Sequence, residues 1–600
     1  MDIPLDDRHC STQTVTQTPV IDPGHANSWK RLQRAIDAEI FSLEVYIQAL
    51  KLRRNALSPI SSLPPEVLAA IFSLLCPPFP NGNSDHHLAQ LHLSHVCHQW
   101  REIALNHPLW WSHVDFTDLS LAGATEFLVR AKSVPLYLEA RVPEGLWNDF
   151  RYTTFQKEVQ TRIPYVCHLS ISAGIYYLHR TLEEFVSSAP TLKYLSLFSR
   201  GGFSDKTTGD HIVVPATLFN GSTPRLSHLK LRNCEISWKS PLLKGLRYLE
   251  ILSPPAKAMP ELTAWLDALD EMPQLKTLAL HCFSAIAPPF PFDVKRTATL
   301  PSLTHLEIFT LGDCALILAH LNLPALITLS VTVTLHCHYP NGDNMRILLP
   351  YIARHAHGPQ GTQPLQSVLI VSDGNRADIL AWPVPDINLR VQGPPTFLVE
   401  TPPSRLALSF TSRDSLNATA RLAIIDLVMS VLPLDGLITL IVREFSIPPD
   451  KQFWLRHSPQ WPLLRHVQLA APSQCGFKEM LLHDNGGRES PLLPSLKELE
   501  LAGEVSENWE SAVMKRVEQG VPLELLDLRM CGPNNFVALE LPGENVVNIL
   551  GPENTGEQMK SAWRTVARAP FREKVNSLSE FYLYNPNGRD GSDEDEDEEE

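Results

Sequence analysis

The chain has 600 residues, of which 44% are hydrophobic and 20% are charged, and these proportions indicate that most of it folds. This length exceeds what one ordinary core supports, so the chain contains either several domains or a repeat array. The net charge is −15, and the acidic run at residues 593–600 carries eight of the negative charges. No basic stripe occurs, so nucleic acid is not an expected partner.

The cysteines and the first residues favour an intracellular protein. Ten cysteines lie far apart without a CxxC pair, as expected for buried thiols in a reducing compartment. Residues 1–20 are acidic and polar, without the apolar core of a secretory signal. Two apolar stretches, 314–335 and 422–442, contain residues that are costly in hydrocarbon. We expect a cytoplasmic or nuclear location and no membrane partner.

A heptad pattern predicts an amphipathic, coiled-coil-like helix over residues 25–58, after a disordered N-terminus at 1–24. The apolar residues at alternating spacings of four and three are Trp29, Ile36, Ile40, Leu43, Ile47, Leu50 and Leu57. Gln33 and Arg54 occupy the remaining positions of this stripe, and Ser58-Pro59 ends the helix. The stripe over residues 29–57 either packs on its own chain or dimerises two chains as a short coiled coil.

The next segment, 61–116, is predicted to contain three helices. Pro64 and Pro65 fit a first helical turn, and a broad apolar face follows them up to a Pro-Pro stop at 77–78. A polar loop precedes a second apolar piece, and a third helix ends before Pro108. About fifty residues cannot bury this much apolar surface internally, so a partner or a neighbouring domain must cover part of it.

This segment resembles the F-box. The residues that carry the resemblance are Leu63-Pro64, Ile71-Phe72, Ser94, Val96-Cys97, Trp100-Arg101 and Leu109-Trp110. The loop at 76–87 is longer and richer in proline than in the compact form, as in many fungal members of the family. We assign residues 59–117 to the F-box.

The resemblance implies a docking module for the Skp-family adaptor of cullin-RING ubiquitin ligases, which are called SCF complexes. Carried over position by position, it implies an adaptor-binding face formed or supported by Leu63, Pro64, Val67, Leu68, Ile71, Leu91, Val96, Cys97 and Trp100. The alternative is a small helical subdomain buried against the rest of the chain. His95 and His98 have a helical spacing that could present two ligands to zinc, but we expect no metal there because these positions vary in type in the F-box pattern.

Beyond residue 117 the pattern Leu-x-x-Leu-x-Leu, or its apolar equivalent, occurs twelve times. Its copies begin at Val166, Leu192, Leu226, Leu246, Leu275, Leu303, Leu326, Leu365, Leu437, Leu464, Leu496 and Leu523. Most starts are 20 to 39 residues apart, close to the 20 to 29 residues of leucine-rich repeats. One gap of 72 residues leaves room for a degenerate copy at 405–408.

These copies resemble leucine-rich repeats. The leucines at the fourth and sixth positions of each copy turn inward along a strand, while the residues between them face solvent. We predict an α/β fold in which residues 118–585 form an irregular leucine-rich-repeat solenoid, with one strand and one helix per repeat stacked in one direction. A generic α/β body is the alternative. A disordered acidic tail at 586–600 is either solvated or a contact for a basic partner.

The sequence favours a protein-binding function over catalysis. It contains no HExxH, P-loop or GxSxG motif, so we expect no catalytic residues, cofactor or metal. His336 and His338 share one strand face, for which a structural role is favoured over zinc. The leading hypothesis is a substrate receptor of an SCF ligase, whose F-box binds the adaptor and a cullin through it, and whose repeat body binds an unknown target protein. The alternative is a non-degradative scaffold that uses the same F-box.

Overall fold

The computed structural model describes residues 26–75, 91–142, 149–200, 212–252, 262–281, 296–310, 314–335, 343–358, 363–373, 376–385, 404–412, 418–443, 448–483, 491–503, 509–530 and 548–550. The predicted disordered termini, the loop at 76–87 and the pair His336/His338 lie outside these ranges. The chain divides into two compact units. Unit 1 comprises residues 1–141 and 147–169, and unit 2 comprises residues 142–146 and 170–600.

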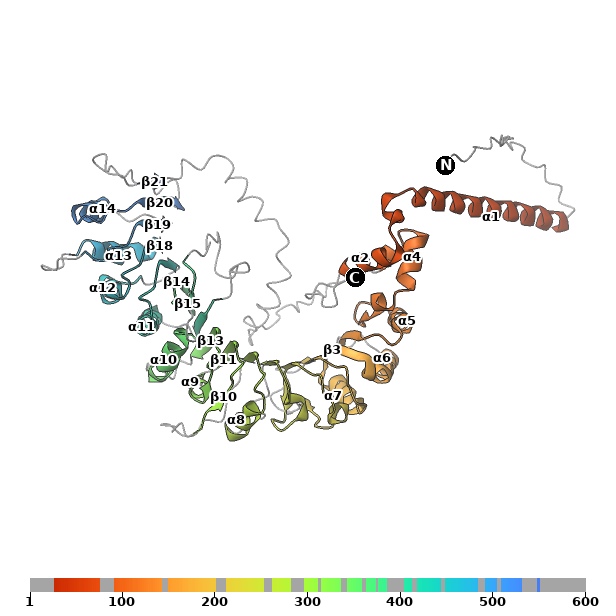
Figure 1. Ribbon diagram of the computed structural model, residues 1–600, viewed down its shortest axis with the longest axis horizontal. Helices are drawn as coiled ribbons and strands as arrows, with labels where there is room; N and C mark the ends of the chain where they lie inside the picture. The colour runs from red at the N-terminus through yellow and green to blue at the C-terminus, as the bar shows by residue number, and fades with distance from the viewer. Residues whose placement is uncertain are drawn as a thin grey trace, which may run out of the picture. The chain divides into compact units, whose positions relative to one another are not determined.

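Unit 1 begins with a long helix, α1 (Ala26–Ala56), where the heptad pattern predicts one. The helix contains neither Gly nor Pro, and the chain leaves it just before the 3-10 helix η1 (Pro59–Ser62), whose first residue cannot donate a helical hydrogen bond. Every side chain from Lys30 to Arg54 is exposed. Figure 1 shows α1 as one continuous helix.

Short helical elements then pack around aromatic rings. They are α2 (Pro65–Leu75), α4 (His98–Leu105) and the 3-10 helix η2 (Pro108–Trp111), and residues 91–94 are also helical. The Phe72 ring lies against the rings of Trp100 and Trp110, with centroids 4.9 and 5.6 Å apart. The indole Nε1 of Trp111 donates to the carbonyl of Ala104 at 2.8 Å, which joins η2 to the end of α4.

Unit 1 continues beyond residue 117 into a small α/β layer. Strand β1 (His113–Asp115) pairs in parallel with β2 (Leu136–Val142), and α5 (Leu121–Ala131) connects them. In α6 (Asp149–Arg162), Arg151 donates to the carbonyls of Phe116 and Leu119 at 2.9 and 3.1 Å. These charge-assisted bonds fasten α6 to the chain that leaves the helical segment.

Unit 2 is a repeat-like α/β body built on a long, mostly parallel sheet. After β3 (Val166–Gly174), which begins in unit 1, the main strands are β4 (Tyr194–Arg200), β6 (His228–Arg232), β8 (Tyr248–Leu252), β9 (Thr277–His281), β11 (His305–Thr310), β13 (Thr328–Leu335), β14 (Ser367–Asp373), β15 (Arg376–Trp382), β16 (Leu406–Ser412), β17 (Thr439–Arg443), β18 (His466–Ala470), β19 (Glu498–Ala502), β20 (Leu525–Met530) and β21 (Asn548–Leu550). Two smaller parallel pairs join β5 (Ile212–Val214) to β7 (Cys234–Ile236) and β10 (Ala298–Thr299) to β12 (Leu321–Asn322).

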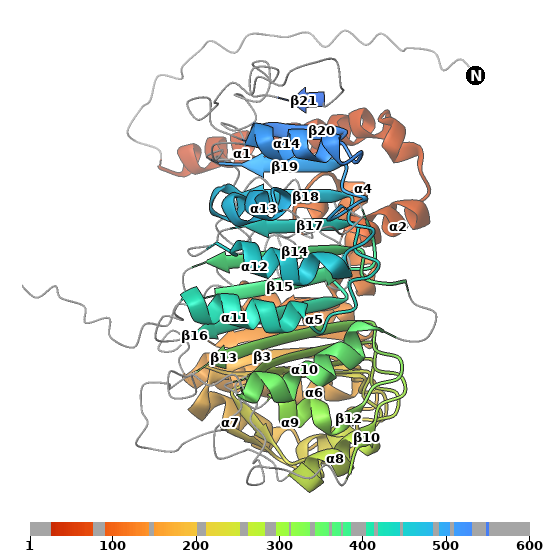
Figure 2. The same ribbon diagram turned by 90° about the vertical axis from the view of Figure 1, so that its left-hand side faces the viewer.

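Helices cover one side of this sheet. They are α7 (Ile175–Glu184), α8 (Leu262–Asp270), α9 (Cys314–Ala319), α10 (Asp343–Ala356), α11 (Ala418–Met429), α12 (Lys451–His457), α13 (Gln474–Leu481) and α14 (Trp509–Glu518). Figures 1 and 2 show α8 to α14 stacked along the outer side of the strands. Within the described ranges, no helix is long and apolar enough to cross a membrane.

The inward residues of the Leu-x-x-Leu-x-Leu pattern form the core of unit 2. Neighbouring parallel strands align them in two rows, each residue of which is at most 2% exposed. One row is Leu195, Leu229, Leu249, Leu278, Leu306 and Leu329, and the other is Leu197, Leu231, Ile251, Leu280, Ile308 and Val331. A side chain removed from water in this way contributes roughly 1.5 to 3 kcal/mol, so each member of the rows stabilises the body.

The prediction of one helix per repeat is wrong between β6 and β8. This connection, residues 233–247, contains β7 and the 3-10 helix η5 (Pro241–Leu243) and no α-helix. The starts at Leu226 and Leu246 are only 20 residues apart. Such a repeat has room for a strand and one or two tight turns, but not for a helix of ordinary length as well.

The prediction that all strands stack in one direction is also wrong. After β13 the spatial order is β16, β15, β14 and then β17, and β15 runs antiparallel to both of its neighbours. Only two residues separate β14 from β15, which suffices for a hairpin, whereas a parallel connection needs a crossover of a dozen residues or more. The degenerate copy predicted at 405–408 supplies β16, which takes the place beside β13 (Figure 2).

The rearranged strands carry a second apolar cluster. It contains Leu369 and Val371 of β14, Trp382 of β15 and Ile441 of β17, each at most 2% exposed, with Leu380 packed against it. In β14 these residues alternate with Val368 and Ile370 of the repeat pattern. Successive strand residues point to opposite faces, so the cluster lies on the face opposite the leucine rows.

Candidate protein-docking surfaces

The start of α2 is fixed by its own backbone. The carbonyl oxygen of Pro64 accepts from the N–H groups of Val67 and Leu68 at 3.0 and 3.1 Å, which places Leu63-Pro64 directly before the first helical turn. Pro65 occupies the first helical position, where its missing N–H costs nothing, and Glu66 complements the helix dipole. The two prolines therefore set the direction in which α2 leaves the chain.

Helix α2 has two apolar faces with different surroundings. Leu68 and Phe72 point into the core, where Leu68 is fully buried and Phe72 meets the tryptophan rings. Val67, Ile71 and Leu74 are spaced by four and three residues and share the other face. Val67 is 42% exposed, Leu74 is 82% exposed and Ile71 is half-buried. An apolar stripe of this kind is suited to contact with another protein.

The residues implied by the F-box resemblance separate into three groups by exposure. Pro64, Val67 and Val96 are exposed, and Leu63, Ile71, Leu91, Cys97 and Trp100 are half-buried. Leu68 is buried and so can only support the face from beneath. Trp100 likewise packs its ring on Phe72.

Among the described residues, the predicted set omitted several exposed apolar side chains of this segment, including Leu74, Leu105 and Leu109. The spacing of Leu74 from Val67 and Ile71 is the signal that could have found it. No comparable periodicity distinguishes Leu105 and Leu109.

Two hydrogen bonds order the residues before α4, and the first of them ties these residues to this helix. Arg101 Nε donates to the carbonyl of Ser94 at 3.0 Å, and the Ser94 hydroxyl donates to the carbonyl of Leu91 at 2.7 Å. Ser94 and Arg101 are therefore structural members of the motif. His98 lies 3.7 Å from Glu102 on the exposed side of α4, and none of the described His, Cys, Asp and Glu side chains gather in threes that could hold a metal.

A second candidate surface lies on the open face of the unit 2 sheet, opposite the leucine rows. One row of aligned residues there contains the rings of Tyr194, His228 and Tyr248. Their centroids are 6.2 and 5.7 Å apart and the ring planes are nearly parallel, so the three rings form a continuous stack across three strands. Burial, and then the charges of Lys230 and Arg247, lower the pKa of His228 and so favour its neutral form.

Charged groups occupy the next row. Lys230 Nζ lies 3.0 Å from Glu250 Oε2 and 5.2 Å from the centre of the Tyr248 ring, and the Tyr248 hydroxyl donates to the same carboxylate. Burial lowers the pKa of Lys230, but the Glu250 carboxylate and Tyr194 together more than offset this effect, so the pKa of Lys230 is raised. Farther along, His281 Nε2 lies 3.0 Å from Glu307 Oε1, and this contact lowers the pKa of the glutamate. We call residues 194, 228, 230, 248 and 250 the ring ladder.

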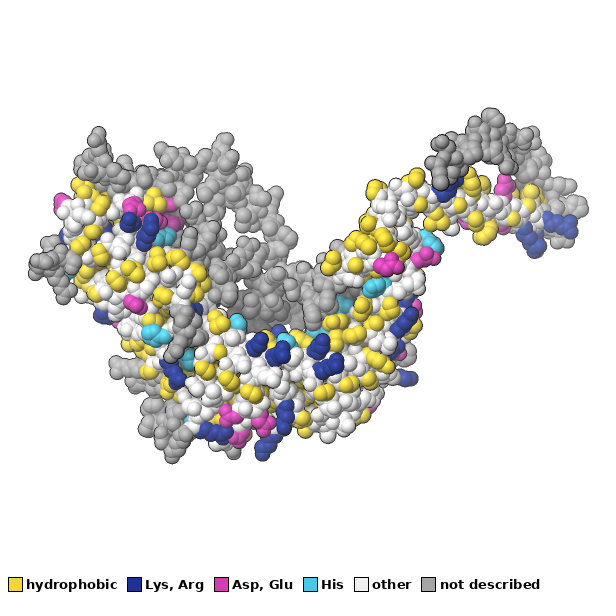
Figure 3. Space-filling view, in the orientation of Figure 1, with side chains coloured by type: hydrophobic (Ala, Val, Ile, Leu, Met, Phe, Trp, Pro, Cys, Tyr) yellow, Lys and Arg dark blue, Asp and Glu magenta, His cyan; other side chains and the backbone are white. Residues whose placement is uncertain are grey.

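The open face differs over the last strands. Arg443 donates to Gln468 Oε1 at 3.0 Å, Gln468 Nε2 donates to Glu500 Oε1 at 2.7 Å, and His466 lies 3.8 Å from the same carboxylate. These groups satisfy one another, so this region is polar and rigid. Figure 3 shows Lys, Arg and His side chains among hydrophobic ones along the inner edge of unit 2.

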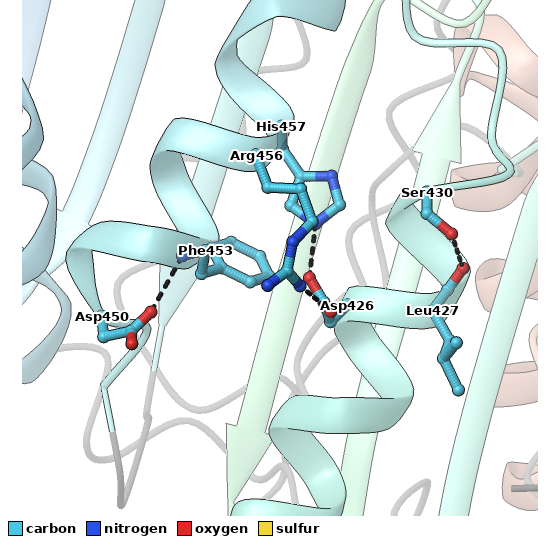
Figure 4. A network of polar contacts seen from close by, with 7 residues as sticks. All are labelled: Asp426, Leu427, Ser430, Asp450, Phe453, Arg456 and His457. Atoms are coloured by element: carbon cyan, nitrogen blue, oxygen red, sulfur yellow. Dashed lines mark hydrogen bonds and ion pairs between the residues drawn. The ribbon is translucent and has the colours of Figure 1, made fainter.

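One Asp–His pair is arranged like the dyad of a catalytic site, but its surroundings indicate a structural role. His457 Nε2 contacts Asp426 Oδ1 at 2.7 Å, and Arg456 contacts the other carboxylate oxygen (Figure 4). His457 is fully buried and its Nδ1 has no hydrogen-bond partner, while the nearby Ser430 hydroxyl donates to the carbonyl of Leu427. The pair joins α11 to α12. Burial lowers the pKa of His457, and this effect exceeds the opposing effect of the Asp426 carboxylate, which raises it.

Comparison with known proteins identifies one domain. Residues 60–117 match the family model described as F-box-like. No curated protein matches the chain. Among solved structures, the chain is similar to one in the crystal structure of the Rad7 and Elc1 complex in yeast, at 12% identity and a TM-score of 0.20, over 87% of this chain and 98% of that chain.

Proposed function

We propose that the chain is a non-catalytic receptor subunit of a ubiquitin ligase of the SCF type, in which residues 60–117 bind a Skp-family adaptor. The observation that carries the proposal is the outward face of α2 within the F-box-like domain. Val67 and Leu74 are exposed there beside the half-buried Ile71, while a neighbouring face of the same helix packs into the aromatic core. A partner that covers this face would remove its apolar side chains from water.

The same proposal assigns target binding to unit 2, taken as an irregular leucine-rich-repeat body. Support comes from the ring ladder, which offers flat aromatic surface beside a lysine and a glutamate. Interfaces are enriched in aromatic residues, and charged pairs beside them fix the register of the bound chain. The receptor would act by proximity, because holding a target near the ligase raises its effective concentration.

The adaptor half of the proposal is tested by titrating the purified full-length chain with a purified Skp-family adaptor. Leu63→Ala combined with Pro64→Ala should weaken binding at least tenfold, and Val67→Asp combined with Leu74→Asp should weaken it further by placing charge on the apolar face. Circular dichroism should stay unchanged, since these side chains are exposed or half-buried. The matched control, Glu102→Ala on the exposed side of α4, should bind like wild type.

Trp100→Ala provides a different comparison. Its ring packs on Phe72, so this variant should lose the local fold as well as the adaptor. A folded Leu63/Pro64 variant that binds like wild type, or a wild-type chain that binds no Skp-family adaptor, would contradict the proposal.

The receptor role itself is tested by affinity purification followed by mass spectrometry. We expect a cullin with the wild-type chain and not with the Val67/Leu74 variant. Target proteins should be retained by that variant but lost when Tyr194→Ala, Lys230→Ala and Tyr248→Ala are combined on the ring ladder. Adaptor without cullin would instead indicate a non-degradative scaffold.

A further inference from the structure

Helix α1 presents an apolar stripe that the rest of its own unit leaves exposed. Ile36, Ile40, Leu43, Ile47 and Leu50 are each between 43% and 55% exposed. The helix has 31 residues and is about 46 Å long at 1.5 Å per residue. A single helix with such a stripe gains stability when a second surface covers the stripe.

The kinds of residue in the stripe favour a second helix as the cover. In heptad notation Gln33, Ile40, Ile47 and Arg54 occupy the a positions, and Trp29, Ile36, Leu43, Leu50 and Leu57 occupy the d positions. In parallel coiled coils, Ile at a and Leu at d, as in the central two heptads, favour two strands over three or four. This pattern therefore indicates pairing with one other helix, and the charges determine the direction of the pair.

The charges along α1 divide into three blocks. Lys30, Arg31 and Arg34 are basic, Asp37, Glu39 and Glu44 are acidic, and Lys51, Arg53 and Arg54 are basic. A parallel pair in register would place like blocks side by side. Its core would hold Arg54 against Arg54, and Glu39 at g would lie near Glu44 at e of the other copy.

An antiparallel pair centred at the level of residue 45 avoids both of these conflicts, although it places Glu44 near its own symmetry mate at the centre of the pair. Residues whose numbers sum to about 90 then lie opposite each other. Ile40 of one copy packs against Leu50 of the other, and Leu43 packs against Ile47. Twofold symmetry repeats each of these pairs on the other side of the centre. The acidic Asp37 and Glu39 face Lys51 and Arg53 of the second copy at both ends.

The two polar positions of the stripe fit the same arrangement. Arg54 lies opposite Ile36 and beside Asp37 of the second copy, so its aliphatic stem can cover the isoleucine while its guanidinium meets the carboxylate. Gln33 lies near the end of the pair, opposite Leu57. We propose that the chain forms a homodimer through an antiparallel coiled coil of α1.

This dimer would join two F-box-like domains. Ala56 lies eleven residues from the centre, so the two copies of this residue would be about 33 Å apart along the coiled coil. Each domain follows its helix after the short turn η1. The inference does not depend on adaptor binding, and a failure of either proposal would leave the other intact.

The first test measures the mass of the purified full-length chain by analytical ultracentrifugation. Wild type should be a dimer at micromolar concentration. Ile40→Asp with Ile47→Asp should raise the dissociation constant at least a hundredfold. The matched control is Val45→Asp with Leu52→Asp, which has the same spacing on the opposite side of α1 and should remain dimeric.

The second test determines direction by charge exchange. Asp37→Lys with Glu39→Lys should weaken the dimer at least tenfold, as should Lys51→Glu with Arg53→Glu, and an equimolar mixture of the two variants should restore a heterodimer. A parallel pair would instead be strengthened by the first variant, because the positive charge introduced at position 39 would then face Glu44 of the other copy. A monomeric wild type, a dimer insensitive to Ile40/Ile47 substitution, or a dimer strengthened by the first variant would each overturn the proposal.

Discussion

Single buried charged residues hold parts of this protein together through backbone carbonyls. Arg516 of α14 is 1% exposed and donates to the carbonyls of Leu492, Leu493 and Leu496, each at 3.1 Å. Burial lowers the pKa of Arg516 to about 10, which still leaves it charged at neutral pH. The half-buried Arg151 uses the same chemistry in unit 1. These arginines act at chain turns, where carbonyl groups lack ladder partners.

A buried histidine, unlike these arginines, destabilises the folded chain at low pH. His355 of α10 is 8% exposed and its Nε2 has no hydrogen-bond partner. Burial, followed by the charge of Arg354, lowers the pKa of His355 to about 4 from an ordinary value of 6.5. The unfolded chain therefore binds a proton in acid that the folded chain does not, and stability falls as the pH drops from 6.5 toward 4.

Replacing His355 should remove this acid sensitivity. At pH 7.5 His355 is neutral in both the folded and the unfolded wild-type chain. His355→Leu should therefore change the unfolding midpoint little at this pH. At pH 4.5 the variant should be more stable than wild type by about 2 kcal/mol. The variant has no group at this position that takes up a proton on unfolding, so it escapes the destabilisation that a difference of about two pKa units between the folded and unfolded states causes. Urea unfolding of both proteins between pH 4.5 and 7.5 measures the difference, and parallel pH profiles would contradict the assignment.

At the scale of single elements, close backbone approach positions α13. A Cβ on Gly476 would lie 2.1 Å from the carbonyl oxygen of Pro449 and 2.9 Å from the carbonyl carbon of Asp450. Asp450 is the N-cap of α12, where its side chain accepts from the N–H of Phe453 at 2.8 Å. The glycine thus allows α13 to rest on the first turn of α12.

Gly476→Ala should separate these two helices. The contact is with backbone atoms that cannot rotate away, so the substitution should cost about 1 to 3 kcal/mol although alanine favours helices. Cys475→Ala, at the exposed neighbouring position, should stay within about 0.5 kcal/mol of wild type. Thermal unfolding of the two variants compares their stabilities directly. Equal unfolding midpoints would contradict the prediction and would show that α13 can move away from α12 without loss of stability.

At the scale of the whole molecule, the repeat-like body should respond to damage locally. In stacked repeats each unit contacts only its neighbours, so stability is approximately a sum of nearest-neighbour terms. Leu408 of β16 is 1% exposed and lies opposite Val331 of β13 and Ile379 of β15. These pairings define the junction at which the strand order reverses.

Leu408→Ala should loosen this junction first. A buried leucine truncated to alanine costs about 2 to 5 kcal/mol. Hydrogen exchange should accelerate most in β13, β15 and β16, and least in β4 and β6, which lie several strands away. Ser409→Ala on the other face of β16 serves as the control. A uniform loss of protection across all strands would indicate one cooperative core rather than a nearest-neighbour array.

The sequence alone determined the features whose cause is local. The heptad stripe and Pro59 predict α1 closely, because helix formation depends on the residues within a few turns. The Leu-x-x-Leu-x-Leu copies predict most of the main parallel strands of unit 2, because alternation marks which residues point inward, but they do not predict β15. The spacing of Leu63-Pro64, Trp100 and Leu109-Trp110 likewise points to the F-box-like domain.

Tertiary structure decided what depends on distant neighbours. Both faces of α2 are apolar, so periodicity could not tell that Leu68 is buried while Leu74 is exposed. The strand β16 pairs with β13 across about seventy residues, and the β14–β15 hairpin brings Trp382 to a cluster with Ile441. The leucine pattern fixes which side of a strand faces the core but is nearly identical in every copy, so it cannot specify which strand lies beside which. That choice depends on connection length and on side-chain packing between segments far apart in the chain.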